Sequence, residues 1–293
     1  MLKSSARVLY FLLILGLPFG SFNVAAAPKH LPDLNQSGLW PQGYVKEAYG
    51  HLIQGGLVIF KLAPDVDLVL DGAPVPCKDG WALIGFDRDQ KSTAELVFKL
   101  GQNQEVRSLT INAKEYNIQR IEGIPQKYVA PKPEAMAKIK ADGQKKRAAR
   151  QEISDLLGFV DGFSWPVLGP ISGIFGSQRF YNGEARRPHY GVDVAAPTNT
   201  PIKAAAPGRV TLAAGDMYFE GGLVFIDHGL GLMSVYMHMN SVTVQVGEMV
   251  DAGDVIGTVG ATGRVTGPHL DWRLQWMGRN LDPALLVPSM PTP

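Results

Sequence analysis

Two short segments of the sequence place a histidine and an aspartate at spacings that suit a metal ion. His189 and Asp193 are four residues apart, so their side chains share one face of a strand and would also align on a helix. His269 and Asp271 are two residues apart, which puts both on one face of a strand. Imidazole nitrogen and carboxylate oxygen are both zinc ligands in proteins. Each segment is therefore a candidate ligand pair.

Polar and apolar residues alternate along the segment that carries the second pair. His269, Asp271, Arg273 and Gln275 form one face, and two leucines and two tryptophans form the other. This pattern is typical of a half-buried strand. A solvated sheet face with an ion pair between Asp271 and Arg273 is the alternative interpretation of the polar side.

A further segment, residues 234–240, repeats the alternation. Ser234, Tyr236, His238 and Asn240 alternate with apolar residues, so we expect these four side chains on one face, with His238 directed toward the same site. A catalytic zinc takes three protein ligands and leaves one position open. The three segments supply that set and leave two groups for proton transfer.

Other reaction classes match fewer of these residues. The glycines between positions 257 and 263 do not match a dinucleotide fingerprint or a phosphate loop, and no serine lies in a nucleophile elbow. Cys77 is the only cysteine, lies far from the histidine-rich region, and leaves no internal disulfide framework. Metal-assisted hydrolysis is the chemistry that uses most of the residues.

The elements that would position these residues are mainly β-strands. Short apolar runs separated by turn residues predict a small β-sandwich over residues 30–128. Helix-forming residues from Glu134 to Leu157 predict a helical linker over residues 129–163, with its basic cluster interpreted as a solvated face. Dense glycines and β-branched runs predict a second, all-β domain of antiparallel strands over residues 164–288.

The N-terminus and the overall charge restrict the location and the partners. Lys3 and Arg7 precede a short apolar run and the small residues around Ala26, which predicts a secretory signal peptide over residues 1–26 and no other membrane contact. A net charge of +1 provides no basic field for nucleic acid, so we expect no nucleic-acid partner. The predicted location is outside the cytoplasm, in a Gram-negative periplasm or at the cell wall.

The order of motifs in the C-terminal half resembles the lysostaphin-type, LytM-like M23 metallopeptidases. The resemblance covers roughly residues 165–288. It rests on Ser172-Gly-Ile-Phe-Gly176, His189-Tyr-Gly-Val-Asp193, Thr200-Pro-Ile-Lys-Ala204, Ile226-Asp-His-Gly229, Tyr236-Met-His238, Val246-Gly247, Gly253-Asp-Val-Ile-Gly257, Gly260-Ala-Thr-Gly263 and Gly267-Pro-His-Leu270.

This resemblance implies a groove in an antiparallel sheet with Zn²⁺ at its floor. It assigns His189 and Asp193 as metal ligands, His238 and His269 as catalytic residues, and His228 to a structural turn. The family's third ligand is the second histidine of a His-x-His motif, and in this sequence that position is Asp271. Aspartate also ligates zinc, although it adds a negative charge. A carboxylate ligand suits manganese better than a histidine does, so manganese is the alternative metal. We expect Arg273, on the same face, to contact Asp271 and offset that charge without binding the metal itself.

The expected activity is zinc-dependent endopeptidase hydrolysis of the peptide cross-links of peptidoglycan. Its substrates would be the stem peptides, and another wall hydrolase or the division machinery is an expected partner. The alternative is a catalytically inactive LytM-like regulator that activates other wall hydrolases, because such domains have lost motif residues. A wall-binding module with a vestigial groove is a third alternative.

Overall fold

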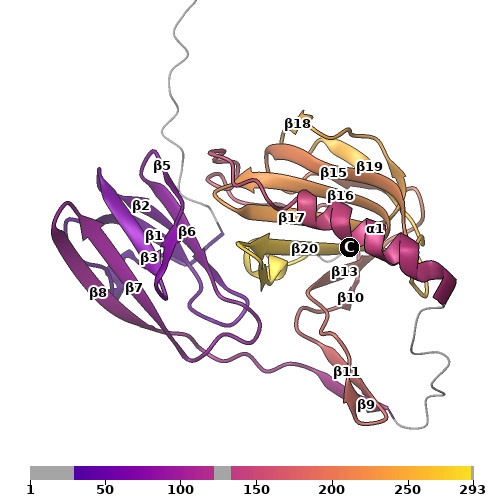
Figure 1. Cartoon of the computed structure of the whole chain (residues 1–293), viewed down its shortest axis with the longest axis horizontal. Helices are drawn as coiled ribbons and strands as arrows, with labels where there is room; N and C mark the ends of the chain where they lie inside the picture. Colours follow the sequence, from indigo (N-terminus) through magenta and orange to yellow (C-terminus); the bar gives the residue numbers. More distant parts are fainter. Residues whose placement is uncertain (1–29, 122–132, 292–293) are drawn as a thin grey trace, which may run out of the picture.

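The computed structural model describes residues 30–121 and 133–291 and confirms a mainly β protein (Figure 1). The predicted signal segment 1–26 and the start of the predicted linker lie outside these residues. Within the described ranges, no helix is both long and apolar enough to cross a membrane.

The N-terminal part is a sandwich of two four-stranded sheets, as predicted. Phe60 of one sheet and Phe98 of the other are fully buried, and their rings meet edge to face with centroids 6.2 Å apart. Hairpin turns with two left-handed residues, such as Asp71-Gly72, connect neighbouring strands. The sheets contain, in spatial order, β1 (Val45–Gly50), β2 (Leu57–Leu62), β6 (Trp81–Gly85) and β5 (Cys77–Lys78), and then β4 (Ala73–Val75), β3 (Val66–Leu70), β7 (Thr93–Leu100) and β8 (Asn103–Thr110).

The predicted linker contains one helix, α1 (Met136–Ala148), which is shorter than the run of helix-forming residues. The run continues to Leu157, but beyond Arg150 the backbone pairs with the C-terminal sheet. Leu230 N–H donates to Ser154 O at 2.8 Å, and Gly158 N–H donates to His228 O at 2.9 Å. Tertiary pairing therefore outweighs the local helix propensity.

The C-terminal part is built on one ten-stranded antiparallel sheet. Its main path is β10 (Ile171–Gly173), β13 (Gly191–Ala195), β20 (His269–Trp276), β17 (Leu232–Val242), β16 (Gly221–Gly229), β15 (Gly208–Met217) and β18 (Met249–Val250). The pair β14 (Pro201–Lys203) and β19 (Val255–Val259) joins β17, and β21 (Arg279–Leu281) joins β20. The chain also forms the 3-10 turns η1 (Asn35–Ser37), η3 (Pro133–Ala135) and η4 (Pro283–Leu285).

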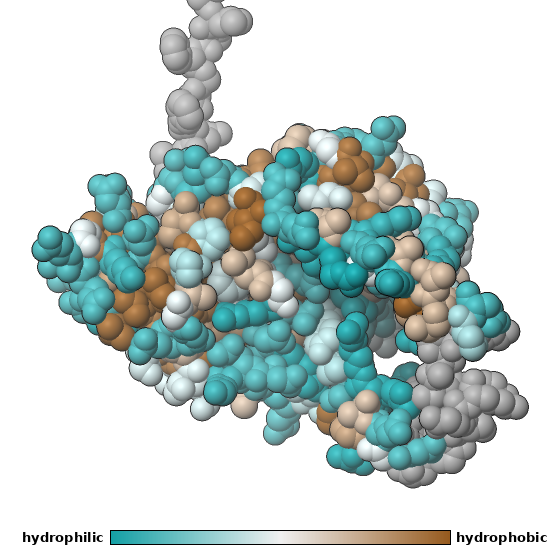
Figure 2. Space-filling view, viewed as in Figure 1, coloured by the Kyte–Doolittle hydropathy of each residue, from teal (hydrophilic) through white to brown (hydrophobic). Residues whose placement is uncertain are grey.

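The two faces of this sheet have different roles. Trp272 and Tyr236, opposed on β20 and β17, are fully buried in the main core. On the other face, Met237 opposes Asp271 and belongs to a second apolar cluster of Leu212, Met217, Leu223, Phe225, Met233, Val235 and Met237. Ala149, just after α1, packs on this cluster. Figure 1 shows α1 running across the sheet on this side, and Figure 2 shows the surface hollowed below it.

The sandwich and the C-terminal sheet contact each other directly. Strand β9 (Ile118–Ile121), which leaves the sandwich, pairs in parallel with β11 (Gln178–Tyr181), and β11 pairs with β12 (Glu184–Ala185). Arg279 Nη1 donates to Gly85 O of the sandwich at 2.8 Å. The β11–β12 hairpin precedes the first predicted ligand, so the sandwich reaches the neighbourhood of the candidate site.

Candidate metal centre

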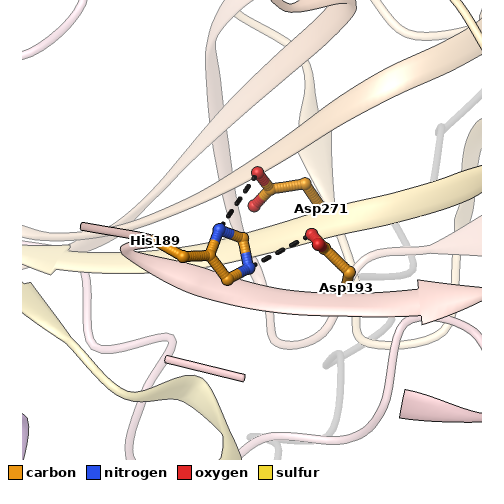
Figure 3. A group of neighbouring side chains, drawn as sticks. All are labelled: His189, Asp193 and Asp271. Carbon is orange, nitrogen blue, oxygen red and sulfur yellow. Dashed lines mark ion pairs between the residues drawn. The ribbon is translucent and has the colours of Figure 1, made fainter. Parts of the chain in front are cut away.

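Three of the predicted site residues converge at one point of the sheet. Asp193 on β13 and Asp271 on β20 are directly opposed, and His189 lies just before β13 (Figure 3). His189 Nε2 is 3.2 Å from Asp193 Oδ1, and His189 Nδ1 is 3.9 Å from Asp271 Oδ2. One ligand atom from each residue lies within 4.8 Å of the other two. This spacing lets a single cation contact all three side chains.

Two of the converging atoms lack hydrogen bonds. His189 Nε2 and Asp193 Oδ1 are buried, and neither has a hydrogen-bond partner among the described residues. Buried polar atoms are nearly always paired in folded proteins, so an orphaned nitrogen beside an orphaned oxygen requires an explanation. A cation would satisfy both, and one nitrogen with two carboxylates is a donor set that Zn²⁺ accepts. The residues therefore fit the metal that the sequence predicts.

Arg273 pairs with Asp271 on the face of β20 where the sequence placed both residues. Its Nε donates to Asp271 Oδ1 at 2.9 Å, and its Nη2 donates to Asp271 Oδ2 at 2.7 Å. Asp271 is only 3% exposed. Burial by itself would raise the pKa of Asp271, but the Arg273 charge and hydrogen bonds outweigh burial and leave the pKa below its usual value. The carboxylate is therefore ionised at neutral pH.

Gly191 is a site residue that the sequence interpretation missed. A Cβ at this position would lie 2.6 Å from Asp271 Oδ1 and 2.6 Å from Arg273 Cγ. The Asp271–Arg273 pair thus occupies the space that any other residue would fill. The signal in the sequence was the glycine between the two predicted ligands His189 and Asp193, but the reason for this glycine lies on the neighbouring strand β20.

His269 and His238 lie side by side at the site, with ring centroids 5.0 Å apart. In each ring Nδ1 is hydrogen-bonded to a backbone carbonyl: His269 to Gly267 O at 2.9 Å and His238 to Thr262 O at 3.0 Å. A carbonyl only accepts, so Nδ1 carries the proton and Nε2 keeps a lone pair in the neutral ring. His269 Nε2 lies 3.8 Å from Asp193 Oδ1.

Burial tends to lower the pKa of both His189 and His238, but the net shifts of the two pKa values are opposite. Burial favours neutral His189, but the neighbouring carboxylates of Asp193 and Asp271 outweigh it and raise the pKa of His189. At His238 burial dominates and lowers the pKa. His238 is therefore neutral at neutral pH, with its lone pair on Nε2.

The expected alternation along β17 is wrong for Ser234 and Tyr236. Tyr236 opposes Trp272 on the core side, and Met237 opposes Asp271 on the site side. By strict alternation His238 would point into the core. Its backbone instead has φ +65°, and the β16–β17 register shifts there. This bulge inserts one residue and turns His238 back to the site face.

Thr262 holds the bulge in place. Its hydroxyl accepts from Gly222 N–H at 2.9 Å and donates to Met239 O at 2.7 Å, so it joins β16 and β17. The backbone carbonyl of Thr262 accepts a hydrogen bond from His238 Nδ1 at 3.0 Å. The sequence identified Thr262 only as part of a glycine-rich motif.

His228 has a structural environment. It is 0% exposed, with Nδ1 2.7 Å from Pro207 O and Nε2 2.7 Å from Ser234 Oγ. Complete burial lowers its pKa to about 4. Neither His228 nor His51 belongs to the metal-compatible group found among the described residues. Cys77 is a free thiol, and burial raises its pKa.

The fold and the site describe a mainly β protein with a candidate histidine–aspartate metal centre on an antiparallel sheet, and comparisons with known proteins identify its family. The model of peptidase family M23 matches residues 187–283. The crystal structure of a putative M23 peptidase from Pseudomonas aeruginosa is 30% identical, superposes with a TM-score of 0.62, and covers 80% of this chain and 93% of its own. The chain belongs to peptidase family M23.

Two curated relatives match part of the chain. The cell division protein DipM of Caulobacter vibrioides is 33% identical over 147 residues, which are 48% of this chain and 23% of DipM. The peptidoglycan DD-endopeptidase ShyA of Vibrio cholerae is 39% identical over 110 residues, which are 37% of this chain and 25% of ShyA. The chain thus matches about a quarter of the length of these relatives.

Proposed function

We propose that this protein is a zinc-dependent endopeptidase that hydrolyses peptide cross-links of peptidoglycan. The observation that carries the proposal is the convergence of His189, Asp193 and Asp271 beside two histidines whose Nδ1 atoms are hydrogen-bonded to backbone carbonyls. Membership of peptidase family M23 and the similarity to a peptidoglycan DD-endopeptidase support the substrate class.

Each site residue has a distinct role in this proposal. His189, Asp193 and Asp271 would hold Zn²⁺, which supplies a Lewis acid that polarises the scissile carbonyl. Nε2 of His238 or of His269 takes the proton from the attacking water, and the second ring donates a hydrogen bond to the developing oxyanion when protonated. The carbonyls of Thr262 and Gly267 hold the two rings in the required tautomer.

Arg273 makes the second aspartate compatible with this chemistry. Two carboxylates and one imidazole give the ligand set a charge of −2, which lowers the acidity that the metal confers on water. The guanidinium bonded to both Asp271 oxygens offsets one of those charges. The set then approaches the −1 charge of a histidine–aspartate–histidine site.

The same pair supports one alternative, a catalytically inactive regulator of other wall hydrolases. Both oxygens of Asp271 already accept from Arg273, so a metal competes with a guanidinium for their lone pairs. If Asp271 stays bonded to Arg273 rather than to the metal, the site binds the metal weakly. The groove then binds a partner or the cell wall without hydrolysis.

One assay separates the two functions. The purified chain is incubated with cross-linked muropeptides, with and without a chelator, beside His269→Ala and a control, His51→Ala, outside the site. We expect chelator-sensitive cleavage by the wild type and His51→Ala, restoration by added Zn²⁺, and a loss of at least about a hundredfold in His269→Ala. Absence of cleavage by the wild-type chain would refute the endopeptidase.

Export to the periplasm or cell wall is a separate proposal. It depends on the predicted signal at residues 1–26. We also propose a partner among wall hydrolases or division proteins, because one relative is a cell division protein. Fractionation of cells that produce the chain with and without residues 1–26 tests the location, and retention of both forms in the cytoplasm would contradict export.

A further inference from the structure

A buried arginine of the N-terminal sandwich contacts the segment that leads to the metal centre. Arg88 lies between β6 and β7 and is 6% exposed. Its Nε donates to Gly176 O at 3.0 Å, and its Nη2 donates to the same oxygen at 2.8 Å. Both bonds join residues 88 positions apart, one in each half of the molecule.

Gly176 is in turn bonded to the ligand residue His189. Gly176 N–H donates to His189 O at 2.8 Å, and His189 N–H donates to Ser177 O at 2.8 Å. The peptide groups of Gly176 and Ser177 therefore hold the backbone of His189 from both sides. Arg88 fixes the carbonyl of Gly176, so a continuous chain of hydrogen bonds runs from the sandwich to the ligand.

Tyr116 fixes the position of Arg88. The Arg88 guanidinium lies 4.3 Å from the centre of the Tyr116 ring, and Tyr116 Oη donates to Arg88 O at 3.1 Å. The same ring covers Gly176, where φ is +83° and a Cβ would lie 2.0 Å from a ring carbon. Arginine, tyrosine and glycine thus form one packed unit in which a shift of Arg88 would displace Gly176.

We propose that Arg88 is a positioning residue for the metal ligand His189, so that the N-terminal sandwich sets the affinity of the metal centre. This inference rests on the proposed role of His189 as a ligand. The planar guanidinium places two donors on one carbonyl, which a lysine ammonium on a flexible stem does not reproduce. Groups behind metal ligands typically change metal affinity by about 10–100-fold when removed.

The experiment compares two arginines that both join the sandwich to the C-terminal sheet. Arg88→Ala and Arg88→Lys remove or weaken the contact to Gly176. Arg279→Ala is the matched control, because Arg279 also donates to a carbonyl across the two parts, Gly85 O at 2.8 Å, but has no bond to the His189 segment. The full chain is used throughout, and Zn²⁺ affinity is measured by competition with a chromophoric chelator.

We expect Arg88→Ala to bind Zn²⁺ about tenfold more weakly than the wild type, Arg88→Lys to lie between them, and Arg279→Ala to stay within about twofold. An unchanged affinity in Arg88→Ala, or an equal loss in Arg279→Ala, would overturn the proposal. A wild-type chain without Zn²⁺ affinity would instead count against the proposed function.

A metal-free measurement tests the positioning independently. Amide hydrogen exchange of the peptides that contain Gly176 and His189 reports the bonds that hold the ligand backbone. We expect faster exchange there in Arg88→Ala than in Arg279→Ala under conditions where both remain folded. Equal protection in the two variants would refute a positioning role whether or not the metal binds.

Discussion

Arg273 holds Asp271 by two hydrogen bonds of 2.9 and 2.7 Å, one to each carboxylate oxygen, on one face of β20. The Asp271 side chain is 4% exposed, and that of Arg273 is 25% exposed. Removal of the arginine therefore leaves a buried carboxylate without its principal counter-charge. The pair therefore sets the charge of the candidate centre, and its disruption is expected to destabilise the sheet.

For Arg273→Ala we expect the free energy of unfolding to fall by about 3 kcal/mol, because an uncompensated charge remains buried. Urea unfolding with a chelator present measures this without a metal contribution. Arg273→Ala/Asp271→Asn removes the stranded charge and should recover part of the loss. A single variant as stable as the wild type would show that the pair contributes nothing.

Gly191→Ala should destabilise the protein by about 1–3 kcal/mol, since its Cβ would overlap Asp271 Oδ1 and Arg273 Cγ. Gly215→Ala is the control, because no atom lies within 4 Å of a Cβ at that position on β15. Urea unfolding compares the two variants. Equal stabilities would show that the crowding at Gly191 relaxes without cost.

Thr262→Val should lower the turnover of the proposed peptidase at least about tenfold while Zn²⁺ affinity stays unchanged, because His238 loses its support but is not a ligand. Thr262→Ser keeps the hydroxyl that bonds Gly222 N–H and Met239 O and should restore most of the turnover. The checks are kcat and KM on muropeptides and Zn²⁺ titration. A valine variant with wild-type kcat would contradict this role.

His228 should make the folded state sensitive to acid. Its pKa is about 4 when folded and about 6.5 when unfolded, so the unfolded chain binds a proton first as pH falls. Neutral His228 therefore contributes on the order of 3 kcal/mol to the free energy of unfolding. This contribution is fully present above pH 6.5 and is lost as the pH falls toward 4. Urea unfolding at several pH values should show a shallower loss for His228→Gln. An equal loss of unfolding free energy with falling pH in the wild type and His228→Gln would contradict this role of His228.

Much of the fold follows from local patterns in the sequence. Strand β20 coincides with the alternating segment from His269 to Trp276, and β2 and β3 coincide with two predicted apolar runs. The helix was predicted too long, because hydrogen bonds of Ser154 and Gly158 to the β16–β17 turn replace helical ones. Propensity describes a segment by itself, and such pairing depends on a partner at least seventy positions away.

The types of candidate ligand, the face of β20 that carries Asp271 and Arg273, and the family resemblance all follow from the sequence alone. These are properties of residue identity and short-range alternation, which a strand expresses wherever it folds. The direction of the His238 side chain and the contact of Arg88 with the segment before His189 become visible only in the folded molecule. A bulge depends on the register of two neighbouring strands, and a contact across 88 positions depends on the docking of two sheets, so no local pattern encodes either.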